Sequence, residues 1–203
     1  VGKLLVSGVN PFLAFTIGII LGFSLGLVNG ILVAKVKLQP FIATLGTMSI
    51  YRGVAYIITG GWPILDIPEG FRHALDGDIF GFIPSSVLLL FIVGILMWII
   101  LKYTRFGNYI YALGSNEEAT KLSGVNVDFN KMLAYAFCGI GAALAGMVLL
   151  ARLGTGEPTA GQGYELNAIA AAAVGGTSLM GGKGTMLGTI LGTILLSALR
   201  VGL

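Results

Sequence analysis

The sequence predicts an all-α protein, a polytopic bundle of five to six transmembrane helices with one short helix in a cytoplasmic loop. Two observations carry this prediction. Of the 203 residues, 56% are hydrophobic and only 10% are charged, which is less than half the charged fraction of a typical soluble domain. The hydrophobic residues also form long runs, and roughly 20 apolar residues are enough for a helix to cross a bilayer. Because these runs leave no room for a soluble domain, residues 1–203 are expected to form a single transmembrane domain.

The six apolar runs differ in length. They cover residues 11–34, 38–59, 83–101, 132–151, 166–180 and 185–199. The fifth run is short for a full crossing and is followed by several glycines. It is either a broken or re-entrant helix beside a cavity or a short ordinary span, and the direction of the sixth run depends on that choice.

Glycines recur at intervals of four in two of the runs. They are Gly18, Gly22, Gly26 and Gly30 in the first run, and Gly184, Gly188 and Gly192 at the start of the last. On a helix this spacing forms one stripe, and small residues let a second helix backbone approach closely. Both runs are therefore predicted to be packing helices, with a flexible hinge as the alternative for the first.

The basic residues predict the orientation of the chain. They gather in two connections, which hold Lys35, Lys37, Lys102, Arg105, Lys121 and Lys131. An excess of Lys and Arg beside spans favours the cytoplasmic side. Segment 60–81 is turn-rich and lacks such an excess, so alternation predicts that it lies on the outer side together with 152–165. The net charge of +3 is explained by these loops and does not indicate a nucleic-acid partner.

Polar side chains inside the runs are candidates for a solute pathway. Arg52 lies deep in the second run, where an unpaired charge is costly, so it is expected to face protein or water. It is either a pathway residue or an arginine that pairs near one end of the helix or snorkels to the interface. Hydroxyl and amide groups suit a neutral polyol as well as helix packing, and the candidates of this kind are Thr44, Thr47, Asn167, Thr177 and Ser178.

No catalytic residues, metal site or cofactor are predicted. His73 is the only histidine, Cys138 is the only cysteine, and no two carboxylates lie within one span. A phosphate-binding loop around Lys183 requires Gly six positions earlier and Ser or Thr directly after. Thr177 and Gly184 occupy those positions, so an enzyme or nucleotide-binding function is disfavoured.

The longest polar interval, residues 104–128, contains a predicted two-turn helix that runs from Asn116 to Ser123. Ser115 followed three residues later by Glu118 fits a capping box. Gly124 can end the helix in the left-handed conformation.

The same short helix carries both polar and apolar groups. Glu117 and Glu118 favour the positive end of the helix, while Ala119 and Leu122 form a small apolar face. Spacing alone leaves two interpretations open, which are a docking element for a partner's groove and a solvated connector.

Three stretches carry a resemblance to a known family. They read LQPFIATLGTMSIYRGVAYIITGG, RFGNYIYALGSNEEATKLSGVNV and ARLGTGEPTAGQGYELNAIAAAAVGGTSLMGGKGTMLGTILG. Over nearly its whole length the chain resembles the membrane subunits of bacterial ABC importers, specifically the ribose-type sugar permeases. The resemblance implies inward transport of a monosaccharide such as ribose across the bacterial inner membrane. It also implies three partners: a second permease copy that completes the pore, cytoplasmic ATPases, and an extracytoplasmic sugar-binding protein.

The resemblance also implies a role for the helix from Asn116 to Ser123. In the family, the corresponding segment is a coupling helix that sits in a cleft of the ATPase. Glu117, Ala119, Leu122 and Gly124 match the family pattern, whereas Glu118 stands where a second small residue is common.

The chain departs from the family at its ends. The amino-terminal spans, with a signature like Gly-Ile-Asp-Leu-Ser-Val-Gly, have no counterpart here, and neither has a final helix after Leu203. The chain is therefore expected to be a piece of a longer permease. Two alternative functions stay open: a permease of the same fold for a nucleoside, another sugar or a signalling furanone, and a self-contained channel or secondary carrier.

Overall fold

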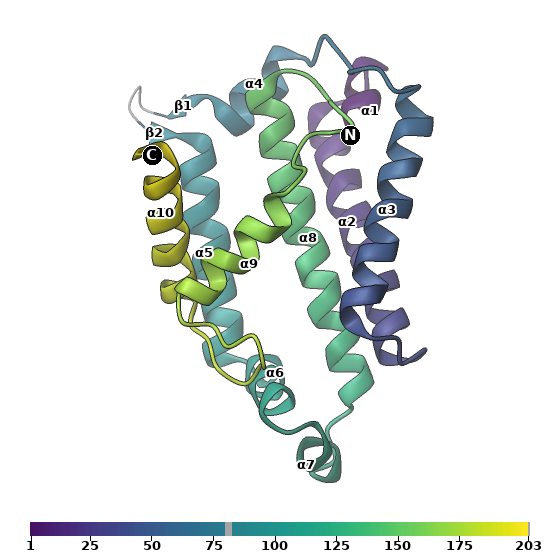
Figure 1. The fold of residues 1–203 in the computed structure, drawn as a ribbon. Coiled ribbons are helices and arrows are strands. Elements are labelled where there is room, and N and C mark those ends of the chain that lie inside the picture. Colours follow the sequence, from purple (N-terminus) through teal and green to yellow (C-terminus); the bar gives the residue numbers. More distant parts are fainter. Residues whose placement is uncertain (80–82, 203) are drawn as a thin grey trace. The chain divides into compact units, whose positions relative to one another are not determined.

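The computed structural model describes residues 1–79 and 83–202, and the regular structure in them is almost all helix (Figure 1). The helices are α1 (Gly2–Val6), α2 (Pro11–Ala34), α3 (Pro40–Thr59), α4 (Glu69–Asp76), α5 (Ser85–Tyr103), α6 (Arg105–Ser115), α7 (Glu117–Leu122), α8 (Val127–Leu153), α9 (Tyr164–Val174) and α10 (Met186–Gly202). Two short strands, β1 (Asp78–Ile79) and β2 (Ile83–Pro84), pair antiparallel with Asp78 opposite Pro84. The prediction of a helical membrane protein is confirmed.

Four helices in the described part of the chain, α2, α3, α5 and α8, are long and apolar enough to cross a membrane. Helix α9 has 11 residues, a length of about 16 Å against a hydrocarbon core of about 30 Å. The end of the fifth apolar run, residues 175–180, is a loop and not a helix. The chain leaves the helix at Gly175, and Gly176 has a φ of 85°, a conformation that glycine adopts without steric cost.

Local sequence signals fix the ends of the first two long helices. Asn10 precedes α2, and its side-chain oxygen accepts a hydrogen bond from the Phe12 backbone nitrogen at 2.9 Å. Pro11 and Pro40 are the first residues of α2 and α3. Proline suits this position, because a backbone N–H there would have no hydrogen-bond partner within the helix. Gly60 ends α3 in the left-handed conformation, with a φ of 66°.

The chain forms two compact units, each described by itself. The first comprises residues 1–89 and 131–160. The second comprises residues 90–130 and the described chain from residue 161 onward. Helices α5 and α8 each contribute residues to both units.

The core of the first unit is built around α4, a helix that the sequence did not predict. Phe71 and Leu75 are buried together with Leu5, Met147 and Ala151. Residues 60–81 were predicted only to be turn-rich, and that prediction did not include the helix at residues 69–76. The available signal was the spacing of Phe71 and Leu75, which places two apolar side chains on one helix face. Gly81, also in that expected loop, lies outside the described residues.

The two segments predicted on the outer side contact each other in the first unit. The Ile64 backbone nitrogen donates to the Gly156 carbonyl at 3.0 Å, and the Gly156 nitrogen donates back to Ile64 at 2.8 Å. The Arg72 Nε also donates to the Ala151 carbonyl at 3.4 Å, near the carboxyl end of α8. These bonds hold α4 and the end of α8 together.

Helix α2 lies beside α8 (Figure 1), and it packs against α8 through its glycines. A Cβ added at Gly22 would lie 2.5 Å from the Ala143 Cβ, and one at Gly30 would lie 2.7 Å from the Met132 Cα. Gly18 faces Met147 in the same way, and Gly26 faces Ala136. The four glycines therefore lie at the contact between two antiparallel helices.

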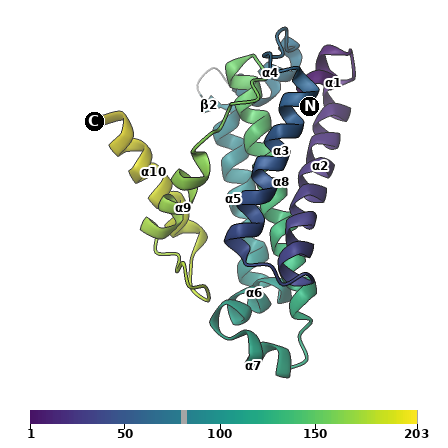
Figure 2. The same cartoon turned by 45° about the vertical axis from the view of Figure 1, so that its right-hand side comes forward.

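In the second unit, α9 and α10 form a tightly packed pair (Figure 2). A Cβ at Gly192 would lie 2.8 Å from the Gly175 nitrogen, and one at Gly188 would lie 3.2 Å from the Gly175 carbonyl carbon. Helix α10 also contacts α5, because a Cβ at Gly94 would lie 3.4 Å from a methyl group of Ile190.

Candidate solute pathway and coupling helix

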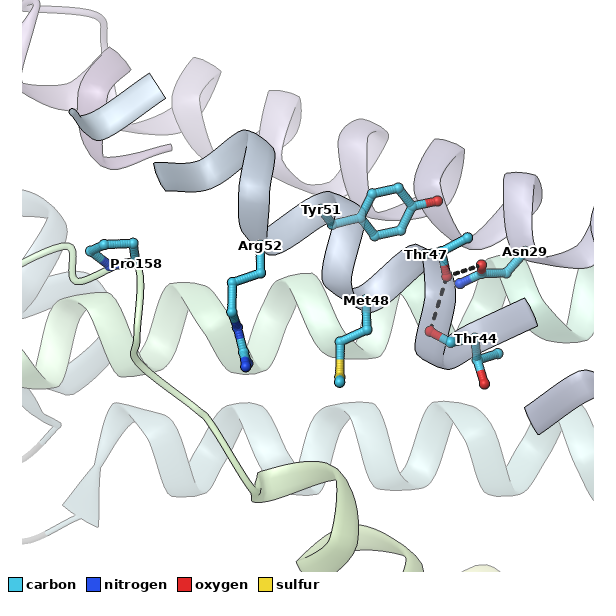
Figure 3. Close-up of a pocket in the computed structure, with 7 residues that line it drawn as sticks. All are labelled: Asn29, Thr44, Thr47, Met48, Tyr51, Arg52 and Pro158. Carbon is cyan, nitrogen blue, oxygen red and sulfur yellow. Dashed lines mark hydrogen bonds between the residues drawn. The ribbon is translucent and has the colours of Figure 1, made fainter. Parts of the chain in front are cut away.

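One face of α3 lines a cavity of about 280 Å³ in the first unit (Figure 3). Thr44, Met48 and Arg52 lie on this face, and their spacing of four residues places them along one stripe of the helix. The rest of the lining comes from Asn29, Thr47, Tyr51 and Pro158. The volume is near the lower end of the range for small-molecule sites.

The neighbouring stripe of α3 joins α2 through polar contacts (Figure 3). The Thr47 hydroxyl lies 2.6 Å from the Asn29 Oδ1 and 3.1 Å from the Thr44 carbonyl, and it can donate its single proton to one of these oxygens at a time. The Tyr51 hydroxyl donates to the Leu25 carbonyl at 3.1 Å. Thr47 is buried, so its bond to Asn29 fixes how α3 lies on α2.

Arg52 is the only charged residue among those that line the cavity. It lies seven residues before the end of α3 at Thr59, about 10 Å along the helix axis. Within the described chain, no hydrogen bond or ion pair engages its guanidinium. Because an unpaired charge on a lipid-facing surface is costly, this face of α3 suits contact with water, solute or another protein.

The sequence-predicted pathway residues fall into two groups. The structure brings Thr44, Thr47 and Arg52 together at the cavity beside α3. The other three, Asn167, Thr177 and Ser178, belong to the second unit.

Those three residues lie on α9 and on the loop that follows it. Asn167 is exposed in the first turn of α9. The Thr177 hydroxyl lies 3.4 Å from the Thr189 hydroxyl, and the Ser178 hydroxyl accepts a hydrogen bond from the Met180 nitrogen at 3.2 Å. Both hydroxyls thus have partners within their own unit.

Sequence reasoning missed four cavity residues: Asn29, Met48, Tyr51 and Pro158. Two of them left a readable signal. Asn29 is the only amide side chain in the first apolar run, and polar residues inside spans commonly have a functional role. Met48 lies midway between Thr44 and Arg52 at helical spacing. Tyr51 and Pro158 gave no such signal, because their place at the cavity depends on tertiary packing.

The short helix of the polar interval is α7, but its cap differs from the prediction. Asn116 is the N-cap, and its Oδ1 accepts from the Ala119 nitrogen at 3.0 Å. The capping box assigned to Ser115 was wrong, because Ser115 is the last residue of α6, a helix that the sequence did not predict. Gly124 follows the helix with a φ of 82°, as expected for a left-handed terminus.

Helix α7 presents an exposed surface that contains the predicted contact residues. Glu117, Glu118 and Ala119 are exposed, and Leu122 has 89% of its surface exposed. Thr120 is buried on the opposite side, and its hydroxyl donates to the Asn116 carbonyl at 2.7 Å. A single exposed leucine is common on protein surfaces, so this exposure is compatible with both interpretations of the helix, a docking element and a solvated connector.

Among residues 1–79 and 83–202, no group of three or more His, Cys, Asp or Glu side chains is placed to hold a metal ion. The cavity lining also contains no carboxylate. Its chemistry is therefore that of hydroxyl, amide and guanidinium groups, which form hydrogen bonds with hydroxylated solutes.

Comparison with known proteins identifies the family. The model of the family described as "Branched-chain amino acid transport system / permease component" matches residues 1–203. The ribose import permease protein RbsC of Escherichia coli strain K12 is 45% identical over 203 residues, covering 96% of this chain and 62% of the relative. RbsC of Bacillus subtilis strain 168 is 42% identical, and the match covers 100% of this chain and 63% of the relative.

A further relative has a different sugar in its name. The D-allose transport system permease protein AlsC of Escherichia coli strain K12 is 40% identical, covering 99% of this chain and 62% of the relative. The chain thus spans less than two thirds of the length of these relatives. No solved structure matches the chain. Since the family model covers the chain from end to end, the protein belongs to the family of branched-chain amino acid transport system permease components.

Proposed function

We propose that this chain is part of the membrane-spanning permease subunit of a bacterial ABC importer in the inner membrane, and that it carries a monosaccharide such as ribose inward. The similarity to RbsC and AlsC over almost the whole chain supports this proposal. In it, the permease does no covalent chemistry. A cytoplasmic ATPase supplies the energy, an extracytoplasmic binding protein delivers the sugar, and a second permease copy completes the pore.

The cavity beside α3 is the observation that favours a sugar over an amino acid. An amino acid is a zwitterion. Its carboxylate could pair with Arg52, but its ammonium group needs a carboxylate or several carbonyl partners, and no carboxylate is among the described residues of the lining. A neutral polyol needs only hydrogen-bond partners. Thr44, Thr47 and Arg52 supply such groups on one helix, and we assign them to the translocation pathway. We also assign Asn167, Thr177 and Ser178 to the translocation pathway, because their amide and hydroxyl groups suit a neutral polyol.

Uptake into proteoliposomes tests this function. The full-length permease, its ATPase and its binding protein would be reconstituted and supplied with labelled ribose, allose or a branched-chain amino acid. We expect ATP-dependent uptake of a sugar and none of the amino acid. Amino-acid uptake would overturn the choice of substrate, and solute flux in vesicles without the ATPase would indicate a channel or secondary carrier.

A substitution at Arg52 tests the pathway assignment. Hydrogen bonds to charged groups contribute about 1.5–3 kcal/mol, so Arg52→Gln should lower sugar uptake at least roughly tenfold. The matched control is Arg152→Gln, which changes an exposed arginine outside the cavity. Equal uptake by both variants would remove Arg52 from the pathway.

We further propose that α7 is the coupling helix that docks into the ATPase. The docking residues are Asn116, Glu117, Glu118, Ala119 and Leu122, and the flanking residues Ser115 and Gly124 set the ends of the segment. In a Cys138→Ala background, Glu117→Cys should crosslink to a cysteine in the ATPase cleft. Trp62→Cys, exposed in the predicted outer segment, should not crosslink. Failure of Glu117→Cys at every cleft position would count against docking.

We also propose six crossings, of which the fifth is a half-length helix continued by irregular chain. Helix α9 covers only about half of the membrane thickness. The loop after it contacts α6, which follows the predicted inner end of α5. In the Cys138→Ala background, Met180→Cys should react with a thiol reagent from the cytoplasmic side, since 94% of Met180 is exposed, and Gln162→Cys should react from the outside. Reaction of both from the outside would indicate a re-entrant segment and five spans.

A further inference from the structure

Helix α6 contacts the loop that joins α9 to α10. The Tyr111 hydroxyl donates a hydrogen bond to the Gly184 carbonyl at 2.9 Å, across 73 residues of sequence. Both residues belong to the second unit, and the bond is partly buried. A tyrosine hydroxyl that reaches a loop carbonyl holds the loop at a fixed distance from the helix.

One turn further along α6, the contact is between two backbones. A Cβ added at Gly114 would lie 3.0 Å from the Gly182 Cα, and a Cβ at Gly181 would lie 3.0 Å from the Gly114 Cα. Gly181 and Gly182 have φ values of 91° and 75°, a conformation that favours glycine. Because no side chain separates the two backbones, displacement of one pushes directly on the other.

The loop is itself closed by hydrogen bonds. The Ser178 nitrogen donates to the Lys183 carbonyl at 2.9 Å, and the Gly181 nitrogen donates to the Ser178 carbonyl at 3.1 Å. The Thr177 hydroxyl oxygen lies 3.4 Å from that of Thr189 in α10, a weak contact, and Thr177 directly precedes Ser178 in the chain. A push at Gly182 is therefore passed to the segment that carries Thr177 and Ser178.

At this same carboxyl end, α6 is joined to α7 by the single residue Asn116. The Asn116 nitrogen donates to the Ala112 carbonyl of α6, at 2.9 Å, and its side chain caps α7. Backbone and side chain of this one residue are thus bonded to both helices. The connection leaves α7 little freedom to move without α6.

We propose that Tyr111 and Gly114 are positioning residues that transmit displacement of α7 to the α9–α10 loop, and so to the polar groups of Thr177 and Ser178. The chain of contacts runs from α7 through Asn116 to α6, and from α6 to Gly182 and Gly184. This proposal rests on the proposed function of α7 as the element that the ATPase moves.

The test measures sugar molecules imported per ATP hydrolysed, in proteoliposomes that contain the full-length permease, ATPase and binding protein. Tyr111→Phe removes the hydroxyl and retains the ring. The ratio should fall about fivefold, the size expected for loss of one hydrogen bond, while complex assembly and ATP hydrolysis stay unchanged. Tyr109→Phe is the control, because within the described chain the Tyr109 hydroxyl has no hydrogen bond, and it should retain the wild-type ratio.

A second variant acts on the backbone contact. Gly114→Ala should lower the same ratio, because its methyl group displaces the loop at Gly182. Gly146→Ala, at a helical glycine with open space around it, should not. If the wild type imports sugar with ATP and both Tyr111→Phe and Gly114→Ala keep its ratio, the transmission proposal is overturned and the proposed function stands. If the wild type imports no sugar, the proposed function fails and the inference fails with it.

Discussion

Glycines spaced by four residues occur in α2 and in α10, yet they join different kinds of helix pair. In α10 the stripe consists of Gly188 and Gly192, because Gly184, which was predicted to belong to it, lies in the loop before the helix begins at Met186. Helix α2 has 24 residues and its partner α8 has 27. Helix α10 has 17 residues and its partner α9 has 11. In the first pair the glycines meet alanine, methionine and backbone along two continuous helices, whereas in the second they meet the end of a short helix and its glycine terminus.

The difference between the two pairs shows what the spacing of glycines predicts and what it does not. Spacing of four residues indicates that a backbone approaches that face, because only a missing side chain leaves the room. It does not indicate the length or continuity of the partner. The α2–α8 pair is therefore expected to resist distortion more than the α9–α10 pair, where a short helix can shift as a body.

The strongest test of this comparison is Gly22→Leu in α2. The new side chain would overlap Ala143 and the Gly139 carbonyl, and relief would require movement of a 27-residue helix. Overpacking of this kind costs about 3 kcal/mol. The free energy of unfolding of the purified full-length permease, measured by denaturant titration in micelles, should fall by about that amount. Gly46→Leu, at a helical glycine of α3 with open space, serves as the control and should change it little.

Gly188→Leu makes the matching change in α10. Its side chain would overlap the Gly175 backbone and lie against the Thr185 hydroxyl. We expect a smaller loss of about 2 kcal/mol, because α9 has only 11 residues to move. Gly141→Leu is the control, since the space beside Gly141 is open. A loss equal to or greater than that of Gly22→Leu would contradict the comparison.

The fold was predictable where hydrophobicity alone decides it. Helix α2 begins and ends where the first apolar run does, at Pro11 and Ala34. Helix α4 was not predicted, because its eight residues lie between glycines and prolines. Its stability depends on the burial of Phe71 and Leu75. The end of α9 at Val174 was not fixed by the sequence, because residues 175–180, which read GGTSLM, are compatible with both a broken helix and a short ordinary span.

The candidate site was predictable in its chemistry but not in its grouping. Arg52 stood out because a charge inside a span is rare, and Thr44 and Thr47 lie near it on the same helix. No sequence spacing could place Asn29 beside Thr47, since 18 residues and a turn between helices separate them. The cap of α7 was misassigned for a related reason, because α6 extends to Ser115 and leaves only Asn116 free to act as the cap.

Thr47→Val extends the comparison to the polar contact between α3 and α2. The substitution keeps the shape of the side chain and removes the hydroxyl that lies 2.6 Å from Asn29. Interhelical hydrogen bonds in membrane proteins contribute about 0.6–1.7 kcal/mol, so the free energy of unfolding should fall by about 1 kcal/mol. Ser49→Ala, which removes a hydroxyl bonded only to its own helix at Leu45, should have a smaller effect. Equal losses would mean that the Asn29 contact adds nothing to stability.

Thr177→Val should have the smallest effect on stability and separates packing from transport in the α9–α10 pair. The Thr177 and Thr189 hydroxyl oxygens are 3.4 Å apart, beyond the usual range for such a bond, so the free energy of unfolding should fall by less than about 0.5 kcal/mol. A pathway role predicts that sugar uptake falls more than this loss explains. Thr193→Val is the control, because the Thr193 hydroxyl donates to the Thr189 carbonyl within α10 at 2.8 Å, and its uptake should match the wild type. A stability loss above about 1 kcal/mol with unchanged uptake would make Thr177 a packing residue, and the two glycine-striped pairs would then differ in helix length and not in function.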